Sequence, residues 1–333
     1  MADRYARHAL VPGWDQTALA RAEVVVVGVG ALGTEVARLL GQAGVGRLVL
    51  CDPDVVSESN LSRGALFRAA DVGRAKVEAA AEALEVIAPD TVVDPRHAEL
   101  AAAVGLGELR SASLVVSCLD SLAARLRLTT RCNLVGVPLL DGGTSPWGGE
   151  VRYHAVDDAC FGCGLSAADR AATDDPWSCA DLVRPHHHGA SAPISALVAS
   201  WMATTALRLL FGHRPGTTVV RVDPVRGAAH QVRLDRDPEC PFHETVTEVF
   251  PLAHNHFSTA GDLLAAVRDD EVALTWTPFP VDGRTSVHLR DAPGGARLAD
   301  LGVAPRELLP VVTPGSAGRL RYLELAPTGE GAP

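Results

Sequence analysis

The sequence predicts an α/β fold: a Rossmann-like, mostly parallel β-sheet with helices on both faces and a small α+β extension at the C-terminus. The run Val24–Val27 is β-branched throughout, as is typical of a central parallel strand buried on both faces. A glycine pattern follows this run directly and opens a helical segment. A later apolar run, Leu114–Ser117, also ends in polar residues. These observations favour a ligand site at the carboxyl ends of the strands.

The glycines Gly28, Gly30 and Gly33 form the pattern G-x-G-x-x-G. The first allows a tight turn, the second lets the backbone approach a phosphate, and the third lets the helix pack close to the strand. A helix is expected from about Ala31 to Gln42, and its first amides would point at the phosphates. The pattern predicts a nucleotide site, and it fits a nicotinamide dehydrogenase as well as an ATP-binding enzyme.

A second strand is expected at Arg47–Cys51, and Asp52 stands at its end. An acidic residue at that position can hydrogen-bond a ribose hydroxyl. Asn60, Arg63 and Lys76 follow, and a dehydrogenase does not need them. Arginine suits bidentate phosphate contacts and lysine acts as a point charge, so these three side chains could converge on a polyphosphate.

The strand expected at Leu114–Ser117 leads to Cys118, Leu119 and Asp120. An aspartate at the carboxyl end of such a strand lies where open α/β sheets bind ligands. Its carboxylate could hold magnesium, which prefers oxygen ligands. It could also cap the helix expected from about Ser121.

Taken in order, these motifs resemble the ThiF/MoeB/HesA family, the bacterial relatives of ubiquitin-activating enzymes. The resemblance extends from about Arg4 to His243. Gly64 is a departure, because the family usually has glutamine after the arginine of the SNLxR motif. The matching motifs are RYARH from Arg4, PGWD from Pro12, GVGALG from Gly28, DPD from Asp52, SNLSR from Ser59, DVGRAKVEAA from Asp71 and SCLDS from Ser117.

The resemblance implies ATP as cosubstrate, with ribose on Asp52, phosphates on Asn60, Arg63 and Lys76, and magnesium on Asp120. The nucleotide ligands that it implies are Gly28, Gly30, Ala31, Gly33, Asp52, Asp54, Asn60, Arg63, Lys76, Asp120 and Ser121. The catalytic residues that it implies are Arg7, Arg63, Lys76, Asp120 and Cys179. Arg7 would reach the partner's ATP site across a homodimer interface. On the residues alone, Asn60 could instead cap a turn, and Arg63 and Lys76 could be solvated charges.

Seven cysteines, an odd number, and the lack of a signal peptide argue against a secreted disulfide framework and favour a reducing cytoplasm. Cys51, Cys118 and Cys132 lie in apolar stretches and are expected to be buried. The pair Cys160 and Cys163 has metal-ligand spacing. A redox role is the alternative for that pair.

A second knuckle, Cys240 and His243, lies far downstream of Cys160 and Cys163. Three thiolates and one imidazole make a closed tetrahedral zinc site, and the family often has two such pairs at these places. We therefore expect a structural zinc ion without a catalytic role.

Cys179 lies in a polar loop with Trp177, Arg184 and His186–His188 nearby in sequence. The family places a conjugating cysteine in a similar loop, and a neighbouring cation or base would raise the thiolate fraction of Cys179. An unreactive loop thiol is the alternative. The three histidines are expected to be solvated, with metal binding as their alternative.

Two domains are expected: an adenylation domain, residues 1–244, and an extension of unknown role, residues 245–333. With 47% hydrophobic residues the chain can bury a large core, and its net charge of −10 argues against nucleic acid as a partner. The apolar window Ser195–Phe211 is too short to span a bilayer and contains Arg208, so it predicts a buried helix.

The function that the resemblance implies is ATP-dependent adenylation of the C-terminal carboxylate of a small β-grasp, ubiquitin-like sulfur-carrier protein ending in Gly-Gly. The acyl-adenylate would then pass to Cys179 or to an external sulfur donor. ATP, magnesium and zinc would be the bound groups of a cytoplasmic homodimer. A ribosomal peptide is the alternative substrate. An NAD-dependent dehydrogenase and a non-catalytic scaffold that binds a carrier protein are the alternatives from other classes.

Overall fold

A computed structural model of the chain describes residues 4–170, 189–246, 248–268, 271–281, 284–313 and 321–328. The chain divides into two compact units. The first comprises residues 1–97 and 112–244, and the second comprises residues 98–111 and 245–333. One border between the two units falls after residue 244, and residues 98–111 lie in the second unit.

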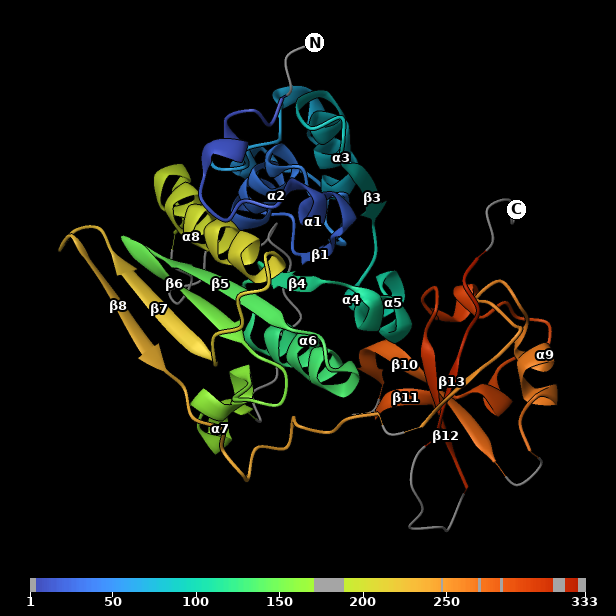
Figure 1. The fold of residues 1–333 in the computed structure, drawn as a ribbon. Helices are drawn as coiled ribbons and strands as arrows, with labels where there is room; N and C mark the ends of the chain where they lie inside the picture. The colour runs from blue at the N-terminus through green and yellow to red at the C-terminus, as the bar shows by residue number, and fades with distance from the viewer. Residues whose placement is uncertain are drawn as a thin grey trace. The chain divides into compact units, whose positions relative to one another are not determined.

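The first unit is built on an eight-stranded sheet with the order β3-β2-β1-β4-β5-β6-β7-β8 in the described part of the chain (Figure 1). Its strands are β1 (Glu23–Val27), β2 (Arg47–Cys51), β3 (Val92–Arg96), β4 (Leu114–Ser117), β5 (Leu139–Ser145), β6 (Gly148–His154), β7 (Thr218–Asp223) and β8 (Ala228–Arg233). Strands β1 to β5 pair in parallel, and β6, β7 and β8 add to them in antiparallel pairs. This sheet confirms the predicted mostly parallel α/β fold.

Helices cover both faces of this sheet, as predicted. Helices α2 and α8 pack together on one face, and α6 lies on the other (Figure 1). The helices of this unit are α1 (Gln16–Arg21), α2 (Ala31–Ala43), α3 (Lys76–Ile87), α6 (Leu122–Val135), α7 (Ala167–Arg170) and α8 (Ala192–Leu210), with 3-10 turns η1 (His8–Leu10), η2 (Glu58–Asn60), η3 (Ala69–Asp71) and η4 (Phe161–Gly164).

The core of the first unit lies between the central strands and these helices. The valines of β1 are at most 2% exposed, because helices cover both sides of the strand. Val198 and Met202 of α8 are completely buried. By length and composition alone, α8 is the one described helix that could cross a membrane, and several of its residues pack in this core.

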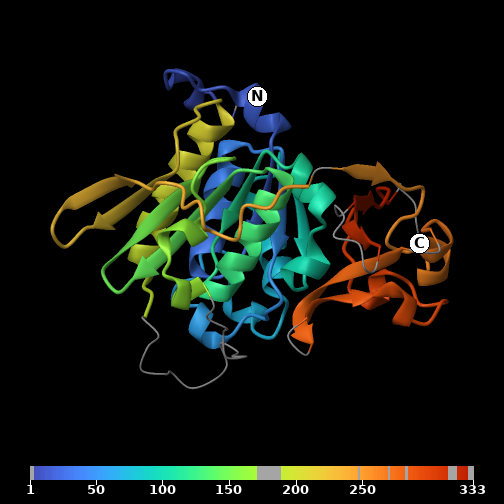
Figure 2. The same cartoon turned by 90° about the horizontal axis from the view of Figure 1, so that it is seen from below.

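The antiparallel end of the sheet leaves the core. In both views the β7–β8 hairpin projects from the sheet edge (Figure 1 and Figure 2). Strand β8 is exposed along nearly its whole length. The parallel strands β1, β2 and β4, whose carboxyl ends carry the candidate site, are buried instead.

The second unit contains a five-stranded sheet with the order β11-β10-β12-β13-β9 among its described residues. Its strands are β9 (Val249–Pro251), β10 (Val272–Val281), β11 (Arg284–His288), β12 (Leu308–Val312) and β13 (Arg321–Glu324). Its helices are α4 (Leu100–Ala103), α5 (Leu106–Ser111) and α9 (Ala260–Ala265), with 3-10 turns η5 (Leu289–Asp291) and η6 (Ala299–Leu301). These elements confirm the small α+β extension.

The contacts of Glu307 explain why residues 98–111 belong to this unit. The Glu307 residue is 1% exposed, and its carboxylate accepts a hydrogen bond from the Leu106 amide at 3.1 Å. Glu324 pairs with Arg306 at 3.1 Å and with Arg110 of α5. The segment between β3 and β4 is thus held by groups about two hundred residues downstream.

Candidate functional site

The three glycines of the turn between β1 and α2 differ in what surrounds them: two are closely packed and one faces open space. Gly28 has φ +89°, and a Cβ there would lie 2.7 Å from the Cys118 carbonyl oxygen. A Cβ on Gly33 would lie 1.9 Å from the Gly28 carbonyl oxygen. A Cβ on Gly30, the N-cap of α2, would meet no atom within 4 Å. Two glycines are therefore required by the fold, while the third leaves space at the helix N-terminus, where phosphates bind.

Asp52, Asp54 and Lys76 come together beside this turn. The Asp52 carboxylate, in a residue 6% exposed, accepts hydrogen bonds from the Val29 amide at 2.7 Å and the Asp54 amide at 2.8 Å. The Lys76 ammonium lies 2.7 Å from Asp54 Oδ2 and 3.8 Å from Asp52 Oδ1. Burial raises the pKa of Asp52, while Lys76 and the two amides oppose this. Lys76 is 4% exposed, which excludes its interpretation as a solvated surface charge.

Asn60 and Arg63 share one turn. Asn60 is 7% exposed, and its Oδ1 accepts a hydrogen bond from the Ser57 amide at 3.0 Å. Asn60 therefore caps this turn, as its alternative interpretation proposed. The half-buried Arg63 donates from Nη1 to the Ser59 carbonyl at 2.7 Å.

This turn is tied to the first turn of α2 through Thr34. The Thr34 hydroxyl accepts a hydrogen bond from the Ala65 amide at 3.1 Å and donates to the Gly30 carbonyl at 2.8 Å. Gly64, which precedes Ala65 in this turn, packs against Phe67. A Cβ on Gly64 would lie 2.4 Å from the Phe67 ring. This close contact is a physical reason for glycine where the family usually has glutamine.

Asp120 follows β4 and is exposed. The interpretation of Asp120 as a helix cap is wrong, because the N-cap of α6 is Ser121, whose hydroxyl accepts a hydrogen bond from the Ala124 amide at 3.1 Å. The Asp120 carboxylate is not engaged in that cap. Ser121 therefore has a structural role, and its ligand role is a proposal only.

Sequence reasoning missed Arg125 and Asp141. The Arg125 guanidinium pairs with the Asp141 carboxylate, which is buried at the end of the parallel part of β5. Burial raises the pKa of Asp141, and Arg125 opposes this. A signal was present: the apolar run before Asp141 ends in an aspartate, like the strands before Asp52 and Asp120.

The two remaining predicted catalytic residues are Arg7 and Cys179. Arg7 is exposed at the start of η1. Cys179 lies outside the described residues, as do His186–His188 and Trp177. The expectation of buried cysteines is confirmed for Cys51 and Cys132, each 1% exposed.

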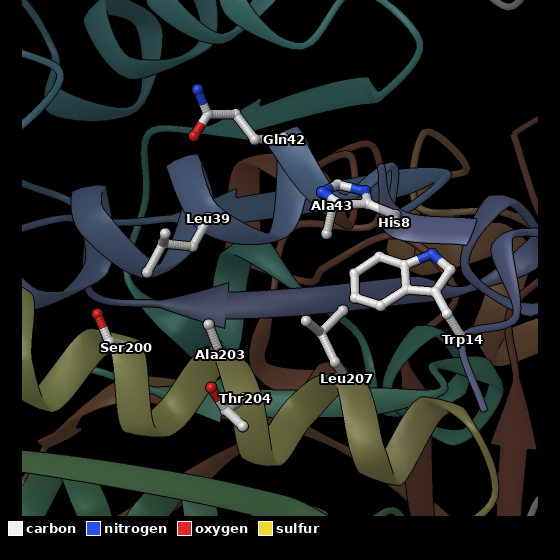
Figure 3. A pocket seen from close by; sticks show the side chains of 9 residues that line it. All are labelled: His8, Trp14, Leu39, Gln42, Ala43, Ser200, Ala203, Thr204 and Leu207. Carbon is white, nitrogen blue, oxygen red and sulfur yellow. The ribbon is translucent and has the colours of Figure 1, made fainter. Parts of the chain in front are cut away.

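A cavity of about 270 Å³ lies elsewhere, between the N-terminal segment, α2 and α8 (Figure 3). Apolar side chains line most of it, and none of the predicted nucleotide ligands takes part. The residues that line it are His8, Trp14, Leu39, Gln42, Ala43, Ser200, Ala203, Thr204 and Leu207. Its lining does not suit a nucleotide phosphate.

Cys160, Cys163, Cys240 and His243 form the predicted cluster, with all four ligand atoms within 4.8 Å of one another. Cys160 Sγ lies 3.8 Å from Cys163 Sγ and 3.6 Å from Cys240 Sγ. A tetrahedral zinc ion with bonds of about 2.3 Å places its sulfur ligands about 3.8 Å apart. Burial raises the pKa of Cys160 to about 12, and the neighbouring thiols add to this, so thiolates here need a cation. The donor set fits zinc better than a redox pair.

Known proteins resemble this chain over 71–73% of its length. The Salmonella typhimurium molybdopterin-synthase adenylyltransferase is 32% identical over 244 residues, which cover 71% of this chain and 94% of that protein. The SAMP-activating enzyme E1 of Haloferax volcanii is 30% identical over 72% of this chain and 87% of its own. The crystal structure of E. coli MccB with MccA-N7isoASN shares the fold, with TM-score 0.59 and 18% identity over 73% of this chain and 75% of its own. Residues 3–242 match the ThiF family, to which this chain belongs.

Proposed function

We propose that the chain is an adenylyltransferase that uses ATP to activate the C-terminal carboxylate of a small β-grasp sulfur-carrier protein ending in Gly-Gly. The observation that carries the proposal is the group of Asp52, Asp54 and Lys76 beside the glycine turn. The names of the curated relatives, a molybdopterin-synthase adenylyltransferase and a SAMP-activating enzyme among them, support the reaction class. Membership of the ThiF family disfavours a dehydrogenase.

The proposed reaction uses this placement. A carboxylate oxygen attacks the α-phosphorus of ATP, the bond from that phosphorus to the bridging oxygen breaks, and an acyl-adenylate and pyrophosphate form. The open space at Gly30 lets the phosphates approach the first amides of α2. Asp52 keeps lone pairs for a ribose hydroxyl, because each of its oxygens accepts one amide bond.

Lys76 supplies the charge next to the phosphates. It is paired with Asp54, whose side chain is 43% exposed. When a phosphate binds, the ammonium can exchange this partly solvated carboxylate for phosphate oxygens without moving away from Asp52. Arg63 and Asn60, in the turn tied to α2, would contact the same phosphates. Such fixed charges stabilise the transition state by positioning and electrostatics.

Asp120 is the proposed magnesium ligand, since it offers an exposed carboxylate at the carboxyl end of β4. Magnesium would neutralise charge on the phosphates. We further propose a cytoplasmic homodimer in which Arg7 completes the partner's site. Cys179 would receive the activated acyl group, and zinc would be structural because its four protein ligands leave no open position.

A ribosomal peptide is a second candidate substrate. The ThiF family match ends at residue 242, so residues 245–333 lie outside it. A substrate other than a sulfur carrier would explain why the chain has this additional unit.

ATP–pyrophosphate exchange distinguishes these substrates. We expect exchange with a β-grasp carrier ending in Gly-Gly and none with the same carrier shortened by those two residues. Exchange with an unmodified ribosomal peptide, but with no carrier, would favour the second candidate. Exchange that does not depend on any carboxylate would contradict both.

A further inference from the structure

The guanidinium of Arg125 joins two segments of chain next to Asp120: strand β5 and the loop after β4. It pairs with the Asp141 carboxylate, donates to the Gly142 carbonyl at 3.0 Å, and donates to the carbonyl of Leu119. Leu119 immediately precedes Asp120. One side chain thus fixes the loop after β4 to strand β5.

This connection is rigid because it is largely removed from water. The Asp141 side chain is 1% exposed and the Arg125 side chain 13%. Asp141 lies opposite Ser117, the last residue of β4, so it sits where the parallel pairing of β4 and β5 ends. The planar guanidinium holds its donors in a fixed fork, which lysine cannot reproduce.

The rest of the loop is anchored on either side of Leu119. The Cys118 amide donates to the Val27 carbonyl at 2.8 Å, and Gly28 packs directly on the Cys118 carbonyl. Ser121 caps α6. The Leu119 peptide lies between these anchors, and the contact from Arg125 holds its carbonyl.

We infer that Arg125, held by Asp141, is a positioning residue that sets where the Asp120 carboxylate stands relative to the α-phosphate and its metal. The inference rests on the proposed function, in which Asp120 binds magnesium. Arg125 touches backbone and Asp141, so it acts through Asp120. A misplacement of about 1 Å in such a group costs about 10²-fold in rate.

Arg125→Lys keeps a positive charge for Asp141 but loses the fork. The matched control is Arg47→Lys, which disturbs a charge pair with Asp94 (2.6 Å) at the amino end of β2, away from the site. We expect Arg125→Lys to lower the kcat of ATP–pyrophosphate exchange about 100-fold. The KM for ATP should be unchanged, the magnesium concentration for half-maximal exchange should rise, and Arg47→Lys should match wild type.

A double variant tests the route through Asp120. Adding Arg125→Lys to Asp120→Ala should cause no further fall in exchange, because the carboxylate being positioned is gone. Two results would overturn the inference. One is a double variant whose loss of exchange is the product of the two single losses. The other is an exchange rate of Arg125→Lys equal to that of Arg47→Lys. Wild-type exchange by Asp120→Ala would instead reject the proposed metal ligand, a separate failure. If Arg125→Lys does not fold, Asp141→Asn replaces it, and an unchanged magnesium requirement in Asp141→Asn would overturn the inference.

Discussion

Gly30 and Gly33 lie three residues apart in the same turn, and they should respond differently to substitution by alanine. In Gly33→Ala the new Cβ would lie 1.9 Å from the Gly28 carbonyl oxygen, a backbone atom that cannot rotate away. In Gly30→Ala it would meet no atom within 4 Å, and the glycine's φ of −86° is open to alanine. The first substitution should therefore damage the fold, and the second should damage nucleotide binding.

The magnitudes follow from these contacts. Overpacking against fixed backbone costs about 3 kcal/mol, the upper end for inserted methylenes. In a unit of this size, that lowers Tm by about 6–12 °C. Gly30→Ala should keep Tm within about 3 °C, but its methyl group occupies the space for a phosphate. Losing one charged hydrogen bond costs about 1.5–3 kcal/mol, which weakens ATP binding about 10–100-fold.

Thermal melts without ATP, followed by calorimetric ATP titration, measure the two effects separately. Gly33→Ala with the wild-type Tm would refute the packing argument. Gly30→Ala with wild-type ATP affinity would show that the phosphates do not bind at this helix N-terminus.

Three further outcomes are expected. Lys76→Ala should lower ATP–pyrophosphate exchange about 10²–10³-fold, because it removes the ammonium beside Asp54, and wild-type exchange would exclude it as a phosphate ligand. Burial lowers the pKa of His154 from 6.5 to about 4, so the folded state resists a proton that the unfolded state accepts. As pH falls from 6.5 to 4, the free energy of unfolding of the wild type should therefore fall by about 3 kcal/mol. His154→Asn should not show this loss, and its side-chain amide can still donate to the Ala159 carbonyl. Equal losses in urea unfolding would contradict this. His243→Ala should reduce bound zinc and Tm, and full zinc content by metal analysis with an unchanged Tm would reject this ligand.

The central strands could be predicted because their sequences carry a strong local signal. Val24–Val27 and Leu114–Ser117 are buried on both faces, so nearly every residue is apolar. The zinc-type cluster could be predicted for a similar reason, since each half is a short knuckle with its own spacing. The order of the motifs along the chain then indicated that the two knuckles belong to one site.

Contacts between distant segments could not be predicted in the same way. Residues 98–111 form short helices that look like an ordinary crossover, and contacts with the distant Glu307 and Glu324 place them in the second unit. The Arg125–Asp141 pair depends on the register of β4 and β5, which the sequence does not state. The presence of glycine at position 64 is explained by the position of the Phe67 ring, which only the structure gives.

The central claim is that the group formed by Asp52, Asp54 and Lys76 presents the α-phosphate of ATP to a carboxylate. The most direct measurement is to identify the products of a single turnover with ATP labelled at the α-phosphate and a carrier ending in Gly-Gly. The account predicts pyrophosphate and label attached to the carrier's C-terminus as the adenylate. Release of ADP and inorganic phosphate, with no label on the carrier, would contradict it.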